Sequence, residues 1–463
     1  MTTLTLIAVA VVAYGLWKPH RYATALALGG ATPAGAALVA GSTAVPTFYF
    51  VALGALLVLF VQLVHRSRTR RRLEHPVTPG TTPLLLLAVW AVVVTVAAPL
   101  LFDGMTVYAA GGVPNQLRAG SLTSSNQAQI VYAVLSVAVV VLLARGAGAR
   151  TQVVGLAAGL TMVLSLWAYA GKNLGVPFPT GFFDNSPAFA YIDGAPGGVV
   201  RFRGIFSEPA GLAVACLVTI AYMTARLPQV RGLRRVGVGV VLAIAVFLGS
   251  ISTSTTFIVS IALLVAMAVG VWLVEVVIAR RELTLSGVSG AAAALAVLPF
   301  VVPLVLAFLT GEVSAKVGTS SYRDRSSADG DSYRIVLDTF GFGVGLGSNR
   351  PSSFLAAMLS TVGLIGTVLF VAAVVVLVRR TWTLRGYRPV VWALAAALLT
   401  KLISGPDLND TSGLMWLCLG VLAHAAAVRQ REEAVEQTPR GQHGAAALAS
   451  RDPDGEDAPT PSR

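Results

Sequence analysis

The fold class follows from residues 82–102, which read TPLLLLAVWAVVVTVAAPLLF and contain no charged side chain. A helix of about 20 apolar residues is long enough to cross the roughly 30 Å hydrocarbon core of a bilayer. Residues 82–102 are therefore predicted to form a transmembrane helix.

Similar apolar runs recur along the whole chain. Hydrophobic residues make up 55% of the sequence and charged residues only 12%, about half the charged fraction of a typical soluble protein. We predict an all-α polytopic membrane protein of about 12 to 13 transmembrane helices, with one membrane domain over residues 1–427. The predicted spans lie near 3–17, 22–40, 47–64, 82–102, 128–144, 152–170, 209–225, 236–250, 254–277, 290–309, 353–378, 389–404 and 411–427.

Arginine-rich loops follow every second predicted span, and they explain most of the formal charge of +13. Cytoplasmic loops of membrane proteins carry such an excess of Lys and Arg, so we place these loops inside the cell. This distribution argues against nucleic acid as a partner, because no separate soluble domain carries the basic residues. The arginines group within 66–72, 145–150, 226–235, 280–281 and 379–388.

The alternate loops then face outward and include the longest polar segments. The two larger outer loops are residues 171–208 and 310–352; the others are 103–127 and short segments near 251–253 and 405–410. The tail, residues 428–463, is rich in Pro, Gly, Ala, Glu and Asp and lacks the apolar residues needed to fold. We predict that this tail is cytoplasmic and disordered.

Metal and nucleotide chemistry find little support in the sequence. Cys216 and Cys418 lie inside predicted spans, and all five histidines lie on or near the predicted cytoplasmic side. We therefore expect no metal site on the outer face and no cofactor. The glycine run at 341–347 lacks the Lys-Ser/Thr ending of a phosphate-binding loop, so we interpret it as a flexible re-entrant turn before the 353–378 helix.

Strong charges also occur immediately before the 209–225 span, in the outer-loop stretch RFRGIFSEP at 201–209. In an extended segment Arg201 and Arg203 point the same way, and two guanidinium groups can hold a pyrophosphate. Gly204 would let a ligand approach the backbone. A structural alternative is that Ser207 or Glu208 caps the helix and Arg203 pairs with Glu208.

The loop at 310–352 offers a second set of charges. Residues 331–338 read as a short amphipathic helix with Asp331 or Ser332 as its cap. Arg334 and Asp338 would share a face of this helix, which is equally consistent with an ordinary surface ion pair. Arg350 closes the glycine-rich turn, and an outer site that gathers Arg201, Arg203, Arg334 and Arg350 would suit a pyrophosphate.

Three motifs carry a resemblance to a known family. They are RGIFSEP at 203–209, GVGLGS at 343–348 followed by LSTVGLIG at 359–366, and the hydroxyl run STSTT at 252–256. In order and in position relative to the spans, these motifs resemble those of bacterial polysaccharide polymerases and O-antigen ligases. The similarity covers roughly residues 200–370, a little over a third of the chain.

The resemblance implies a metal-independent glycosyltransferase in a bacterial plasma membrane. Such enzymes transfer a polyprenyl-pyrophosphate-linked glycan at the outer face, in some cases together with other polysaccharide-export proteins. By position, Arg203 would contact the pyrophosphate or reacting sugar, Glu208 would be the acidic residue, and Arg334 would match an outer-loop arginine. Ligases of the family resemble one another in an outer-loop His, where this chain has NRPSS at 349–353. This difference favours a polymerase.

Residue chemistry adds that arginines would stabilise the charge developing on a pyrophosphate leaving group. Glu208 is the best-placed base for the attacking hydroxyl, with Asp324, Asp331 and Asp338 as alternatives.

Other function classes stay open. A flippase or transporter predicts charges at mid-membrane, where the sequence offers only Glu275 and Lys401, both near helix ends; an O-antigen-ligase-like transferase and a non-catalytic membrane partner are the other readings.

Overall fold

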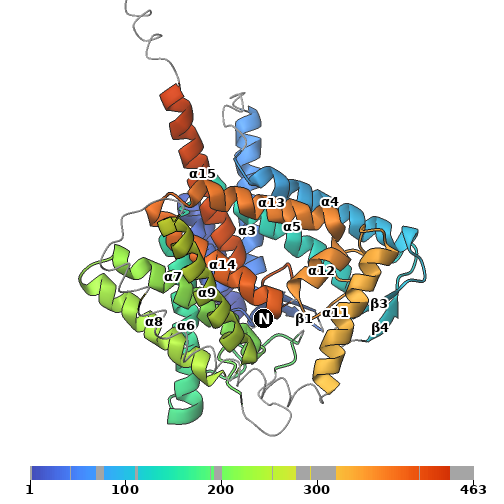
Figure 1. Ribbon diagram of the computed structural model, residues 1–463, viewed down its shortest axis with the longest axis horizontal. Helices are drawn as coiled ribbons and strands as arrows, with labels where there is room; N and C mark the ends of the chain where they lie inside the picture. The colour runs from blue at the N-terminus through green and yellow to red at the C-terminus, as the bar shows by residue number, and fades with distance from the viewer. Residues whose placement is uncertain are drawn as a thin grey trace, which may run out of the picture.

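The computed structural model describes most of the chain as a bundle of helices (Figure 1). The described residues are 3–41, 43–68, 78–109, 113–187, 189–191, 201–252, 254–277, 292, 320–405 and 407–437. The predicted span at 290–309 and most of the tail lie outside these residues.

Within the described ranges, nine helices are long and apolar enough to cross a membrane, so the chain is a multi-pass helical membrane protein. They are α3 (Thr47–Arg68), α4 (Thr81–Leu101), α5 (Ser124–Ala144), α6 (Thr151–Leu174), α7 (Pro209–Arg226), α8 (Leu233–Ile251), α9 (Thr255–Val277), α13 (Gly363–Thr381) and α14 (Arg388–Ile403). Shorter or less apolar helices complete the bundle: α1 (Thr3–Trp17), α2 (Tyr22–Gly30), α11 (Ser320–Asp338), α12 (Phe354–Thr361), α15 (Leu414–Gln437), and the single turns η1 (Pro19–Arg21), η2 (Leu227–Gln229) and η3 (Arg385–Tyr387).

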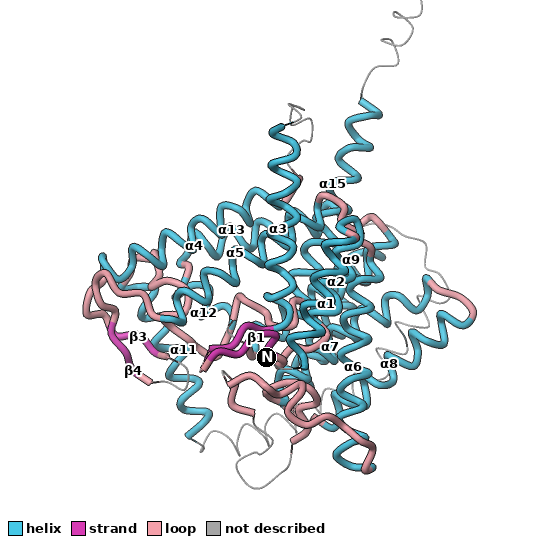
Figure 2. The backbone as a smooth tube through the Cα atoms, turned by 180° about the vertical axis from the view of Figure 1, so that it is seen from behind, coloured by secondary structure: helices cyan, strands magenta, loops and turns pink. Residues whose placement is uncertain are grey.

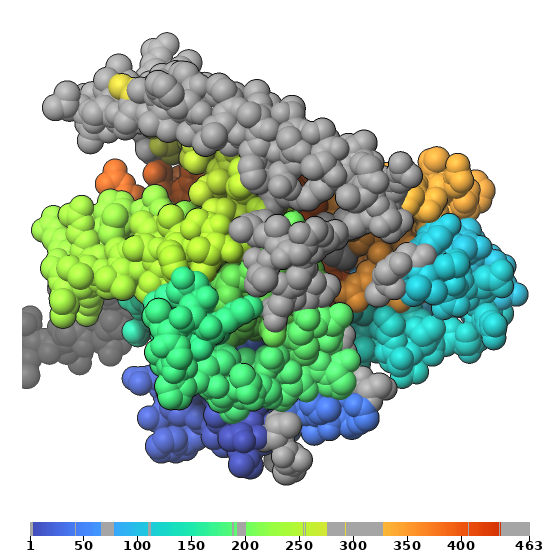
Figure 3. Space-filling model, turned by 90° about the horizontal axis from the view of Figure 1, so that it is seen from below, coloured from blue at the N-terminus to red at the C-terminus, as the bar shows by residue number. Residues whose placement is uncertain are grey.

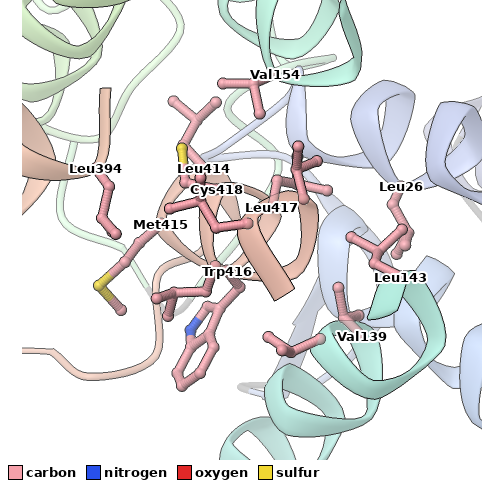
Figure 4. Close-up of a cluster of buried hydrophobic side chains, with 14 of the residues drawn as sticks. Leu26, Val139, Leu143, Val154, Leu394, Leu414, Met415, Trp416, Leu417 and Cys418 are labelled. Carbon is pink, nitrogen blue, oxygen red and sulfur yellow. The ribbon is translucent and has the colours of Figure 1, made fainter. Parts of the chain in front are cut away.

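The centre of the bundle is the first half of α15. Every side chain from Leu414 to Cys418 is buried, and Figure 4 shows them surrounded by Leu26, Leu143 and Leu394 of three other helices. A helix that is apolar on all sides belongs in the interior of a bundle. Helix α15 packs against α5, α13 and α14, while α7 packs chiefly against α14 and α8.

The predicted span at 22–40 is wrong in its second half. Helix α2 ends at Gly30, and the chain then forms an antiparallel hairpin of β1 (Ala36–Ala40) and β2 (Thr43–Pro46). The residue before a proline avoids helical backbone angles, so Pro33 opposes continuation of the helix through Thr32. This hairpin lies at the end of the bundle opposite to the ends of α3 and α15 (Figure 2).

The predicted single span at 353–378 is also wrong, because the helix is broken at Val362. Helix α12 ends at Thr361 and α13 begins at Gly363, whose φ is +70°. The interruption frees backbone carbonyls that must find other donors inside a membrane. Val344 N–H donates to Ser360 O at 2.8 Å and Gly345 N–H donates to Thr361 O at 2.9 Å.

The glycine run at 341–347 is a packed connector rather than a flexible turn. Gly343, Gly345 and Gly347 all have positive φ. A Cβ on Gly343 would lie 2.7 Å from both Gly363 N and Thr361 O, and one on Gly345 would lie 2.6 Å from Thr95 Cα. The run therefore needs glycine because its backbone lies against other backbones, not because a nucleotide approaches it.

Two further elements lie on the face that the sequence predicts to be outside. Strands β3 (Thr106–Tyr108) and β4 (Pro114–Gln116) form a second hairpin. Helix α11 begins at Ser320, so the predicted helix at 331–338 is only its last part, and Asp331 and Ser332 are not caps. Ser332 is instead buried in mid-helix, where its hydroxyl donates to Ala328 O at 2.7 Å.

The prediction of disorder from residue 428 is wrong for residues 428–437, which are helical. Helix α15 continues to Gln437, beyond the apolar segment. Glu433 accepts hydrogen bonds from Arg429 at 2.8 Å and from Arg380 of α13 at 3.0 Å. These charged contacts, which composition does not reveal, extend the helix past residue 428.

Candidate functional site

Helix α7 begins at the residues that the sequence singled out. Glu208 occupies the cap position with extended backbone angles, and Pro209 starts the first turn. The Glu208 side chain makes no capping hydrogen bond and is exposed. Its carboxylate makes no contact with the described residues that would occupy it, so it is open to an incoming ligand.

Arg203 is held in place by three groups. Its Nη1 donates to Phe206 O at 2.8 Å, its Nη2 lies 3.2 Å from Asp184 Oδ2, and its guanidinium lies 4.9 Å from the centre of the Tyr191 ring. The side chain is 13% exposed. The alternative pairing of Arg203 with Glu208 is therefore replaced by a pair with Asp184, on the loop that follows α6.

That loop is itself tied to the β1–β2 hairpin. The Asn185 side chain accepts from Ala36 N–H at 2.8 Å and donates to Ala36 O at 3.0 Å. Tyr191 O–H donates to Ala34 O at 3.2 Å and accepts from Ser186 N–H at 2.9 Å. Burial raises the pKa of Tyr191, so its hydroxyl stays a neutral donor.

Gly204 has a different role from the predicted one. Its φ is +61°, and a Cβ at this position would lie 2.7 Å from Ser165 Oγ on α6. Close packing of the loop on α6 therefore requires the glycine, without any ligand. Arg201 offers a better indication of a ligand, because its Nε is buried and has no hydrogen-bond partner among the described residues. An unsatisfied buried donor is costly, and an anionic ligand would satisfy it.

The four arginines do not form the single cluster that the sequence suggested. Arg201 and Arg203 precede α7, whereas Arg334 lies on α11, which packs against α12. Figures 1 and 2 show α7 and α11 on different sides of the bundle. Figure 3 views the predicted outer face, with the green segment before α7 on the left and the orange segment of α11 on the right.

The second cluster surrounds Arg350. Its Nη2 lies 2.9 Å from Asp407 Oδ2, and its backbone N–H donates to Tyr108 O at 2.8 Å. Arg334 is exposed, and no ion pair joins it to Asp338 in the described part of the chain. The predicted surface pair on α11 is therefore absent, and none of the described residues forms an ion pair with the exposed Arg334.

Asn349 occupies the stretch where the ligases have a histidine. It is 4% exposed, and its Nδ2 donates to Ser332 Oγ at 2.8 Å and to Ser360 Oγ at 3.0 Å. Its Oδ1 accepts from Tyr108 N–H at 3.1 Å. Asn349 thus joins α11, α12 and β3, and its amide is fully engaged in structure.

Sequence reasoning missed two charged residues beside Arg350, and it noted a third, Lys401, only as a charge near a helix end. Arg118 and Asp407 line one cavity with Arg350, and the buried Lys401 donates to Asp407 O at 2.8 Å. The sequence could have indicated Arg118, because it is an arginine in a predicted outer loop, which is the criterion that selected Arg201. Nothing in the sequence could have indicated Asp407, since its importance comes from contacts between segments far apart in sequence.

Two further observations concern the kind of site that this could be. Among the described residues no three His, Cys, Asp or Glu side chains are grouped as metal ligands. No known family model matches the chain, and no curated protein matches it. The fold defines a multi-pass α-helical membrane protein, and its function must be argued from the two charged clusters.

Proposed function

We propose that this protein polymerises polyprenyl-pyrophosphate-linked oligosaccharide repeat units at the outer face of a bacterial plasma membrane. One observation carries the proposal: Arg201, Arg203 and the exposed Glu208 adjoin the start of α7, a helix long enough to span a membrane, at the end that we predict to face outward. Charged groups at the mouth of such a helix are costly unless they are paired, solvated or bound to a ligand. The resemblance of residues 203–209 to the polymerase and ligase motif supports the same substrate class.

The chemistry requires a stabilised leaving group and a base. The acceptor hydroxyl oxygen forms a bond to the anomeric carbon, and the bond from that carbon to the pyrophosphate oxygen breaks. The electron pair leaves with the pyrophosphate, whose developing charge Arg201 and Arg203 stabilise. Glu208 takes the hydroxyl proton. The step uses no metal and no nucleotide cofactor, because the pyrophosphate is already an activated leaving group.

The surroundings of Arg201 and Arg203 suit their proposed role in stabilising the pyrophosphate. Asp184, Phe206 and Tyr191 fix the orientation of Arg203, so its planar fork is preorganised rather than mobile. Among the residues that the structure describes, the buried Arg201 Nε has no partner, and a phosphate oxygen would supply one. Arg350 lies in the second cluster and Arg334 projects from α11, where they would contact parts of the glycan remote from the reacting bond.

A flippase is disfavoured by the places of the charges within the spans. Glu275 lies 3.3 Å from Arg388, joining the end of α9 to the start of α14, and Lys401 bonds to a loop carbonyl. Both contacts link helix ends. In the described residues these two charges hold helices and loops together rather than line a path at mid-membrane.

The test is the intermediate that accumulates in a deletion strain and in Glu208→Gln. We expect single lipid-linked repeat units on the outer leaflet in both, with normal polymer in the control Glu436→Gln on the cytoplasmic extension of α15. Full-length polymer in the deletion strain would overturn the polymerase, and full-length polymer in Glu208→Gln alone would overturn the base. Units stranded on the inner leaflet would indicate a flippase, and long lipid-linked chains would indicate a ligase.

A further inference from the structure

A polar cavity of ≈ 330 Å³ opens where four segments of the chain meet. Its walls come from the β3–β4 hairpin, the start of α5, the connector before α12 and the loop after α14. The side chains that matter for recognition are Asn115, Gln116, Arg118, Gln129, Arg350 and Asp407. The volume lies at the lower end of the range of about 300–1,000 Å³ that is typical of small-molecule sites.

The walls are joined by hydrogen bonds between segments far apart in sequence. Asn126 Nδ2 donates to Leu346 O at 2.6 Å and to Ser348 Oγ at 2.9 Å, which fixes α5 to the connector. Asn409 Nδ2 donates to Gln129 O at 2.9 Å, which fixes the loop after α14 to α5. A cavity with walls fixed in this way is preorganised, so a ligand loses little binding free energy to ordering them.

The charges of the cavity favour an anion. Arg118 and Arg350 contribute two positive charges against the one negative charge of Asp407. The pair of Arg350 and Asp407 is 50% and 36% exposed, and such pairs are worth little in water, so Arg350 can turn to a ligand. Lys401 lies behind Asp407 and adds a further buried positive charge.

The remaining lining suits a sugar ring. Leu346 and Met358 supply apolar surface, while Asn115, Gln116 and Gln129 supply amide donors and acceptors. We propose that this cavity binds a sugar residue bearing a carboxylate, in the glycan chain that the enzyme extends. The choice of a glycan rests on the proposed function; the preference for an anion rests on the cavity alone. A pyrophosphate would leave the amides and the apolar wall unused.

The preference is measured by binding to the purified protein in lipid nanodiscs. The probes are tetragalacturonic acid, the neutral maltotetraose, and farnesyl pyrophosphate. We expect the acidic tetrasaccharide to bind at least about tenfold more tightly than the neutral one, and its affinity to fall with added salt. Equal affinity for the two sugars, or no binding of either, would overturn the proposal. Tighter binding of farnesyl pyrophosphate in competition with the sugar would reassign the cavity to the lipid carrier.

Variants with effects of opposite sign separate recognition from misfolding. Arg118→Gln should weaken binding of the acidic tetrasaccharide by about tenfold, since one of two guanidinium groups is lost. Asp407→Asn should strengthen it, because a competing carboxylate is removed, and an unfolded protein cannot gain affinity. Lys172→Gln, an exposed outer-face cation at the end of α6, is the matched control and should change nothing.

If Arg118→Gln has no effect, or Asp407→Asn weakens binding while the protein stays folded, the cavity is not the site. This assay involves no turnover, so its outcome is independent of the polymerase test. Normal polymer in Glu208→Gln with intact sugar binding would reject the catalytic base and keep the cavity. Loss of polymer in Glu208→Gln, together with no sugar binding, would keep the catalytic base and reject the cavity.

Discussion

Arg203 Nη2 lies 3.2 Å from Asp184 Oδ2, so a partly buried ion pair joins the start of α7 to the loop that follows α6. The next residue along that loop, Asn185, forms two hydrogen bonds with Ala36 of β1. The pair therefore helps to order three segments at once. A pyrophosphate bound at Arg203 would share its guanidinium with Asp184, which orients the group but also reduces its net charge.

The pair predicts strong coupling between the two side chains. Arg203→Gln and Asp184→Asn should each destabilise the protein, and the double variant should be less destabilised than the sum by about 0.5–3 kcal/mol. Arg203→Lys should not restore the polymerising activity that Arg203→Gln loses. An ammonium cannot reproduce the planar guanidinium fork that reaches both Phe206 O and Asp184. Denaturant unfolding in detergent measures the coupling. Additive single effects would show that the two side chains act separately.

The glycine connector gives a prediction about stability. Gly343→Ala should destabilise the protein by about 1–3 kcal/mol, because φ is +90° and a Cβ would lie 2.7 Å from two backbone atoms. Gly237→Ala in α8 is the control. Nothing lies within 4 Å of its Cβ, and alanine favours the helix, so the control should be neutral or stabilising. Equal melting temperatures for the two variants would contradict the packed connector.

Comparison of the predicted and observed helices shows what a hydropathy pattern reveals. The helices formed by long apolar runs were predicted well, because length and composition alone decide whether a helix can cross a bilayer. The break in the helix at Val362 was not predicted, because it depends on the backbone N–H donors of Val344 and Gly345, which lie elsewhere in the chain. Trp90 adds a third contact, donating from Nε1 to Val362 O at 2.8 Å. A hydropathy profile contains no record of such partners.

The candidate site was predicted only in part, for a similar reason. The position of Glu208 at the start of α7 follows from local helix chemistry, and the structure has it there. The partner of Arg203 is Asp184, which lies 19 residues away and carries no local signal. The expected gathering of Arg203 with Arg334 failed because helix packing, and not loop charge, decides where α11 lies.

The charged end of α15 predicts a response to pH. Hydrogen bonding to Arg429, with further attraction from Arg380, lowers the pKa of Glu433 below its ordinary value of 4.5. A lowered carboxyl pKa stabilises the folded arrangement above the ordinary pKa, and this stabilisation is lost as pH falls through the lowered value. A spin label at Glu436 should therefore gain mobility in acid. In Glu433→Gln the mobility should be high at neutral pH and nearly independent of pH. Wild-type mobility that does not change in acid would exclude this contact as the anchor.

The orientation of the bundle decides whether the proposed chemistry is on the correct side of the membrane. Single cysteines at Gly232 and Thr383, both exposed at ends of helices that carry arginines, should resist an impermeant maleimide in intact cells. Cysteines at Lys172, in the last turn of α6, and at Asn115 of β4 should react, since both positions are exposed and lie on the predicted outer side. All four should react after the membrane is permeabilised, which controls for burial. Labelling of Gly232 and Thr383 but not of Lys172 and Asn115 in intact cells would place Glu208 and Arg350 in the cytoplasm. No outer-leaflet glycan would then reach either cluster, and the transferase proposal would fail with the topology.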